Sequence, residues 1–144
     1  MKDIPLIDHI GWDLTRAAQA WKARFTAKMV EAGFPWYAGA RGTLVPLIGR
    51  KGISQNVLVE KSGLTKQAVQ QHLDALEADG IITRAPDPQD ARRKHVAFTE
   101  AGYAALAKAN DIKEEIEAEY IALLGPEVFA TLQQALSTLA DKSS

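Results

Sequence analysis

A run of charged side chains at residues 90–94 has the chemistry needed to bind an anion. Asp90 lies two residues before Arg92, so its carboxylate can pair with that guanidinium and brace a loop. Arg93 and Lys94 then remain available for phosphate oxygens or for a minor groove. The run therefore predicts a basic loop that contacts nucleic acid.

A second group of polar side chains lies before this loop, in a segment with helical periodicity. It consists of Lys66, Gln67, Gln70 and Gln71. Its amide and ammonium groups offer donors and acceptors to base edges and positive charge to phosphates. They fall in the first half of the helix, which is the part of a recognition helix that enters the major groove. The polar residues predicted to contact DNA in the two regions and beside them are Ser54, Thr65, Lys66, Gln67, Gln70, Gln71, Arg84, Asp90, Arg92, Arg93 and Lys94.

The elements that must position these groups can be read from local signals. Residues 53–76 predict two helices, with Gly63 in a left-handed turn between them and Thr65 capping the second. Residues 81–84 and 95–99 predict two paired strands, in which Val96 and Phe98 share a face. Residues 85–94 become the tip of a hairpin, and a helix-turn-helix followed by such a hairpin is a winged helix.

Residues 76–84 (LEADGIITR) and 90–102 (DARRKHVAFTEAG) resemble the signatures LExxGLIxR and DxRxxxVxLTxxG of the MarR family of bacterial transcription regulators. The resemblance implies a homodimer that binds a pseudo-palindromic operator and is commonly released by a small, often aromatic, ligand. Pro46 departs from the family pattern, because it falls inside the expected second helix, where proline costs about 3 kcal/mol. We therefore expect a kink or a late helix start near residues 43–46.

Both ends of the chain predict long amphipathic helices. Residues 8–32 and 101–124 carry apolar side chains at three- and four-residue steps, and a third helix opens at Pro126 and runs to Ala140. A small winged helix cannot bury these apolar stripes, whereas a second copy of the chain can. We expect a single, mainly α domain over residues 1–144, with a small β-hairpin wing. The winged-helix region occupies 38–100, and dimerisation helices occupy 1–35 and 101–144.

The net charge of −1 hides an uneven distribution of charge along the chain. Residues 1–49 and residues 50–99 each carry a net charge of +2, whereas residues 100–144 carry −5. Binding to DNA depends on where positive charge meets phosphate and not on the total. The predicted winged helix therefore has a basic footprint, with the acidic residues directed elsewhere.

The composition excludes several classes of protein. With 144 residues, 47% of them hydrophobic, the chain can form one domain with a core and is not disordered. It has no cysteine, which excludes disulfides and thiolate metal sites. We expect no signal peptide, no membrane span, no cofactor and a cytoplasmic location.

Aromatic residues crowd the N-terminal third of the chain. Trp12, Trp21, Trp36 and Tyr37 are the candidates for an aromatic-lined cleft that binds a small aromatic effector. The same rings can equally fill the core and a dimer interface, and the sequence favours this second interpretation.

Two other classes of function were weighed against a DNA-binding regulator. An enzyme finds little support, because the three histidines are far apart and the chain has neither an HExxH nor a GxSxG motif. A winged helix that binds protein, without ligand response or DNA role, is the alternative. It predicts an apolar patch where this chain has a polar helix face and a basic loop. The preferred interpretation is a DNA-binding transcription regulator that acts as a homodimeric repressor, for which the family resemblance implies release by a small aromatic ligand.

Overall fold

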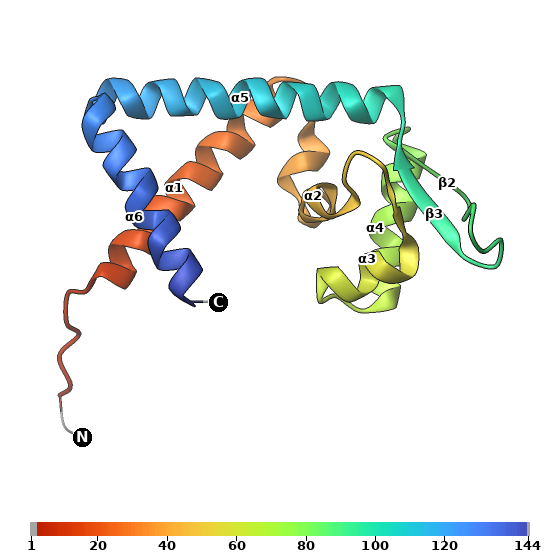
Figure 1. Cartoon of the computed structure of the whole chain (residues 1–144), viewed down its shortest axis with the longest axis horizontal. Helices are drawn as coiled ribbons and strands as arrows, with labels where there is room; N and C mark the ends of the chain where they lie inside the picture. Colours follow the sequence, from red (N-terminus) through yellow and green to blue (C-terminus); the bar gives the residue numbers. More distant parts are fainter. Residues whose placement is uncertain (1–2, 144) are drawn as a thin grey trace.

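The computed structural model describes residues 3–143 and is mainly helical with a small antiparallel sheet. Figure 1 shows α5 along one edge of the molecule, with α6 and the start of α1 at one end and the winged helix at the other. In chain order the elements are α1 (Ile10–Glu31), η1 (Pro35–Ala38), η2 (Ala40–Leu44), α2 (Val45–Ile48), β1 (Ile53–Ser54), α3 (Gln55–Ser62), α4 (Lys66–Ala78), β2 (Ile82–Pro86), β3 (Lys94–Phe98), α5 (Glu100–Leu124) and α6 (Pro126–Ser143).

The predicted helix-turn-helix is confirmed as α3 and α4. Gly63 ends α3 with a φ of 69°, the left-handed conformation that a side chain would make costly. Thr65 then begins α4, and its hydroxyl accepts a hydrogen bond from the Ala68 amide at 3.1 Å. The turn between the two helices is thus built from one glycine and one cap.

The wing is confirmed as the antiparallel pair β2 and β3, with Arg84 opposite Val96 and Pro86 opposite Lys94. A third strand was missed from the sequence: β1 pairs with β3, with Ile53 opposite Val96, and gives the strand order β1-β3-β2. Because β1 runs directly into α3, the sheet joins the wing to the first helix of the helix-turn-helix.

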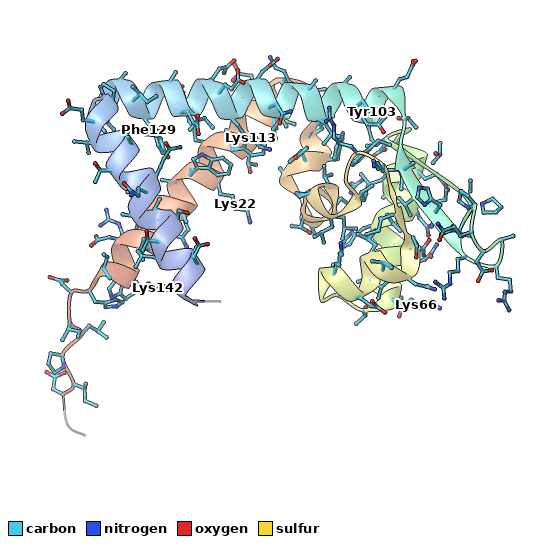
Figure 2. The ribbon with its side chains drawn as sticks, in the orientation of Figure 1. Lys22, Lys66, Tyr103, Lys113, Phe129 and Lys142 are labelled. Atoms are coloured by element: carbon cyan, nitrogen blue, oxygen red, sulfur yellow. The ribbon has the colours of Figure 1, made fainter. Side chains whose placement is uncertain are left out.

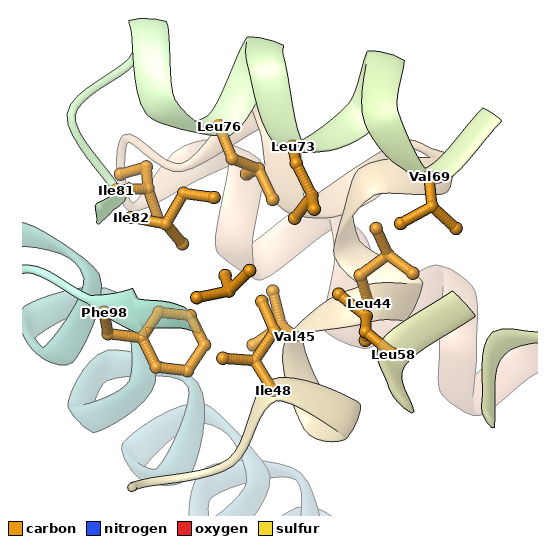
Figure 3. Packing of buried hydrophobic residues seen from close by; sticks show 11 residues of the cluster. Leu44, Val45, Ile48, Leu58, Val69, Leu73, Leu76, Ile81, Ile82 and Phe98 are labelled. Carbon is orange, nitrogen blue, oxygen red and sulfur yellow. The ribbon is translucent and has the colours of Figure 1, made fainter. Parts of the chain in front are cut away.

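One face of α4 packs into the core of the winged helix, together with one face of the hairpin. Figure 3 shows the side chains of this core converging from α2, α3, α4 and the hairpin. Val69, Leu73, Leu76 and Val96 are all fully buried, and Phe98 is 7% exposed. The apolar face of α4 is thereby fixed inward, so its polar face must point outward.

Pro46 is accommodated by a late helix start, as predicted. The residues before it form η2, and α2 begins only at Val45, which places the proline in the first turn. At that position the missing amide hydrogen has no partner to lose, so the helix carries no interior break.

The long helices α1 and α5 pack together around a second, smaller cluster. Phe25 and Met29 of α1 meet Ile112 and Ile116 of α5 inside it. On the surface Arg24 pairs with Glu119 at 2.7 Å, and Lys28 pairs with Glu115 at 3.1 Å. The hydrogen bond from Arg24 lowers the pKa of Glu119. Exposed ion pairs of this kind stabilise a fold only slightly, so the apolar cluster supplies most of the contact.

Helix α6 leaves its apolar side chains largely uncovered in the single chain. Their exposed fractions are between 38% and 55%, which is unusual for leucine and valine at helical spacing. The residues of this apolar stripe are Val128, Leu132, Leu136 and Leu139.

Candidate nucleic-acid interface

The outward face of α4 presents the polar groups predicted from the sequence. Lys66, Gln67 and Gln71 are exposed in its first half, opposite the buried Val69 and Leu73. Figure 2 shows Lys66 at the free end of the winged helix, away from α5. An exposed amide and ammonium edge at the start of a helix has the form needed to enter a major groove.

Gln70, predicted to read bases, is instead engaged within the protein. Its amide oxygen accepts a hydrogen bond from Gln55 at 2.5 Å, and its amide nitrogen donates to Asp74 at 2.9 Å. The side chain is half-buried between α3 and α4. Gln67 and Gln71 are therefore the better candidates for base contacts on this helix.

The predicted brace in the wing loop is present. The Arg92 Nε donates to Asp90 Oδ1 at 3.2 Å, and the same carboxylate oxygen accepts from the Arg92 amide at 3.1 Å. Hydrogen bonding from the Arg92 side chain lowers the pKa of Asp90, which keeps the carboxylate charged. The Arg92 side chain is nevertheless 90% exposed. The loop thus holds a guanidinium in place while leaving it open to a phosphate or a groove.

The rest of the wing tip adds positive charge in the same place. Arg93 lies 3.7 Å from the other oxygen of Asp90 with its side chain 56% exposed, and Lys94 is exposed at the start of β3. Backbone bonds from Asp87 to Arg93 and from Arg93 to Asp90 close the turn. Three cations therefore project from a loop whose backbone is hydrogen-bonded to itself.

Arg84, predicted to contact DNA, is paired within the protein. Its guanidinium lies between Asp74 at 2.5 Å and Glu77 at 3.0 Å, both on α4, and its side chain is only 7% exposed. A group so paired and buried is a poor candidate for a phosphate contact. Its two partners lie on another element, so no local signal near Arg84 revealed the pairing.

The two hydroxyls that were predicted to contact DNA serve as helix caps. Ser54 Oγ accepts from the Val57 amide at 3.4 Å, and Thr65 Oγ1 accepts from the Ala68 amide. Ser54 therefore begins α3, and Thr65 begins α4. The residue that sequence reasoning missed is Gln55, a buried amide at the start of α3 that carries no distinguishing pattern.

The four candidate aromatic residues do not line one site. Trp21 and Tyr37 line a cleft of about 470 Å³ between α1 and the short helices, in which Lys22 and Thr43 also take part. Burial raises the pKa of Tyr37. Trp36 lines a neighbouring groove with Phe34, and Trp12 lies 52% exposed near the N-terminal segment. The structure therefore brings Trp21 and Tyr37 together in one cleft and places Trp36 and Trp12 outside it.

Comparisons with known proteins agree with this geometry. The sequence model of the MarR family matches residues 43–93, which span α2 to the wing. The chain is 30% identical to the transcriptional regulator HosA of Escherichia coli O111:H- over 114 residues, which cover 79% of this chain and 82% of HosA. The chain belongs to the MarR family.

Solved structures extend this relationship to the three-dimensional fold of MarR-family proteins. A probable transcriptional regulator from Pseudomonas aeruginosa is 27% identical, with a TM-score of 0.66 over 92% of this chain and 97% of that one. The transcriptional repressor CouR, bound to a 23-mer DNA duplex, is 25% identical, with a TM-score of 0.70 over 92% of each chain. The winged-helix fold predicted from the sequence is thereby confirmed.

Membership of the MarR family makes the chain a transcriptional regulator and not an enzyme. Within residues 3–143 no helix has the length and apolar character needed to cross a membrane.

Proposed function

We propose that this MarR-family regulator is a homodimeric repressor that binds a pseudo-palindromic operator. The helix α4 enters the major groove through Lys66, Gln67 and Gln71, and the wing contacts phosphates or the minor groove through Arg92. The observation that carries the proposal is the Arg92 side chain, 90% exposed and yet held by Asp90. A cation that is both exposed and oriented is suited to bind an anion.

The distribution of charge supports a DNA partner for this end of the molecule. The wing carries Arg92, Arg93 and Lys94 on one short segment, whereas residues 100–144, which include α5 and α6, carry a net charge of −5. Figure 1 shows α6 at the end of the molecule away from the wing. Phosphates that approach the wing and α4 therefore meet the basic region first.

The uncovered apolar stripe of α6 supports a second copy as partner. Leucine and valine side chains at helical spacing gain free energy when they leave water, and a two-fold dimer buries them in both copies at once. Such a dimer also presents two α4 helices to two half-sites about one helical turn apart. Repression is proposed by similarity to CouR, which is a transcriptional repressor.

A small aromatic effector completes the proposal. The cleft beside Trp21 and Tyr37 has the volume and apolar lining of a small-molecule site, with the Lys22 ammonium and Thr43 hydroxyl among its polar groups. It lies between α1 and the start of the winged helix, where an occupant would contact both parts. Filling of the core by the same rings is the alternative.

A gel-shift titration with DNA from upstream of the chain's own gene tests the proposal. We expect a discrete complex that resists excess random DNA and weakens as salt is raised. The variant Lys142→Ala should bind this DNA as the wild-type protein does, because it removes a positive charge at the end far from the wing (Figure 2). A protein that binds random and upstream DNA alike, or neither, would contradict specific operator binding.

A further inference from the structure

Arg84 joins the wing to α4 through an ion-pair cluster. Its Nη2 donates to Asp74 Oδ1 at 2.5 Å and to Glu77 Oε1 at 3.0 Å, and its Nε donates to Glu77 Oε2 at 3.4 Å. The two carboxylates lie three residues apart on one face of α4, with side chains 56% and 44% exposed. One guanidinium on β2 thus spans two carboxylates of the helix proposed to read DNA.

The cluster continues across α4 to α3. Asp74 Oδ1, which accepts from Arg84, also accepts from the Gln70 amide. The Gln70 oxygen in turn accepts from Gln55, a buried side chain in the first turn of α3. A continuous line of hydrogen bonds therefore connects α3, α4 and β2.

Arg84 contacts α4 at a point on the hairpin from which the outer part of the wing extends. Beyond it on β2, Ala85 and Pro86 are exposed, and on β3 the facing Lys94 is exposed as well. Figure 1 shows the outer part of the hairpin projecting away from the helices. The outer part of the hairpin is thus held on the α4 side by Arg84. On the β1 side it is held by His95, which lies opposite Ser54 and contacts the Lys51 carbonyl oxygen at 3.2 Å.

We propose that Arg84 is a positioning residue that sets the angle between the wing and α4, so that both reach DNA together. The proposal rests on the proposed function of these two elements. Its guanidinium also neutralises two carboxylates that would otherwise repel phosphates from α4. The hydrogen bonds from Arg84 lower the pKa of both Asp74 and Glu77, so the two carboxylates remain ionised to a lower pH than usual.

Distance measurements between spin labels test the role of Arg84 without DNA. The chain has no cysteine, so Lys61→Cys on α3 and Gln89→Cys in the wing loop can be labelled specifically, with unlabelled protein added to dilute dimers. We expect Arg84→Gln to broaden the distance distribution between these labels. A reference pair, Lys61→Cys with Ala78→Cys, spans α3 and α4 only and should keep a narrow distribution.

Arg41→Gln is the matched control for this variant. Arg41 pairs with Asp79 near the end of α4 at 2.9 Å but belongs to η2, so its loss removes an arginine ion pair without touching the wing. It should leave both distance distributions unchanged. If Arg84→Gln broadened both pairs alike, Arg84 would be a general stabiliser of the domain, and the positioning role would be overturned.

Operator binding by the same variants distinguishes positioning from phosphate contact. We expect Arg84→Gln to weaken binding by about tenfold, within the range of coupling between contacting residues. Arg84→Lys keeps the charge but loses the planar fork that spans both carboxylates, so it should recover only part of this loss. Full recovery with lysine, or an unchanged wing distance in Arg84→Gln, would overturn the proposal. Failure of the wild-type protein to bind any operator would contradict the proposed function alone, because the distances are measured in free protein.

Discussion

Arg92 makes the sharpest prediction about a single side chain. Arg92→Ala should weaken operator binding by about tenfold to a hundredfold, because a charge-assisted hydrogen bond contributes about 1.5–3 kcal/mol. Among residues 3–143 its guanidinium is bonded to Asp90 of the exposed loop, so the melting temperature should not change. Fluorescence anisotropy at fixed salt measures the affinity, and Lys142→Ala serves as the control.

The carboxylate of Asp90 should matter less than the guanidinium it holds. Asp90→Ala removes the brace but leaves the cation, so we expect a milder loss of affinity than for Arg92→Ala. Unchanged affinity of Arg92→Ala at physiological salt would show that the wing does not contact the operator.

Substitutions at Gln67 and Lys66 should weaken DNA binding in different ways. Gln67→Ala should cost about 1–3 kcal/mol on the operator and little on random DNA, because an amide reads a base edge. Lys66→Ala should weaken all sequences alike and reduce the slope of log affinity against log salt by about one. Salt titrations with operator and random duplexes measure both effects. Equal losses on both duplexes for both variants would show that α4 does not separate base reading from phosphate binding.

Side-chain roles were predictable where the partner is close in sequence. The Asp90–Arg92 pair and the Thr65 cap follow from spacings of two and three residues, and the structure confirms both. Arg84 and Gln55 could not be assigned in this way. Their partners lie seven to fifteen residues away on other elements, so only the fold brings them together.

The turn between α3 and α4 gives a prediction for an element. Gly63→Ala should lower the free energy of unfolding by about 1–2 kcal/mol, because a Cβ at a φ of 69° is strained. Nothing lies within 4 Å of that Cβ, so the cost is conformational and not a clash. Urea denaturation measures it.

Gly39→Ala is the control for this turn. Gly39 has a φ of −86°, and the added Cβ would meet only the Trp36 carbonyl at 3.8 Å. Its stability should change little. Equal unfolding midpoints for the two variants would mean that the left-handed turn is not required.

Elements with a long apolar period were predictable, and the short ones were not. The three long helices begin and end close to the expected residues, because proline and glycine mark their boundaries. The strand β1 has two residues and no alternation of its own. It exists because Ile53 and Ser54 lie against β3 in the folded protein, which is a tertiary contact.

At the scale of the whole molecule, the ligand cleft and the dimer depend on long-range packing. The tryptophans at positions 12, 21 and 36 cluster in the sequence, yet they line three different hollows in the structure. The sequence supplied the residue types of a cleft but not which of them face one another. The apolar stripe of α6, in contrast, was read directly from its helical period.

The proposed dimer makes the last prediction, because two half-sites require two copies of α4. Leu132→Glu with Leu136→Glu places two charges in the α6 stripe, where the single chain leaves these side chains 38% and 43% exposed. The protomer should still fold, because neither side chain is in a core cluster, but the dimer should dissociate. Truncation after Leu124 should do the same or aggregate, since it removes apolar side chains that contribute about 1.5–3 kcal/mol each when fully buried.

Sedimentation at micromolar concentration measures this change, and Gln133→Glu is the control, because it adds a charge beside the stripe. The dissociated variant should bind an isolated half-site as the wild-type protein does but lose its preference for the full operator. For the wild type, inserting about five base pairs between half-sites rotates them to opposite faces of the duplex and should abolish tight binding. A truncated chain that stayed a soluble dimer with full affinity would show that α6 does not hold the two α4 helices in register.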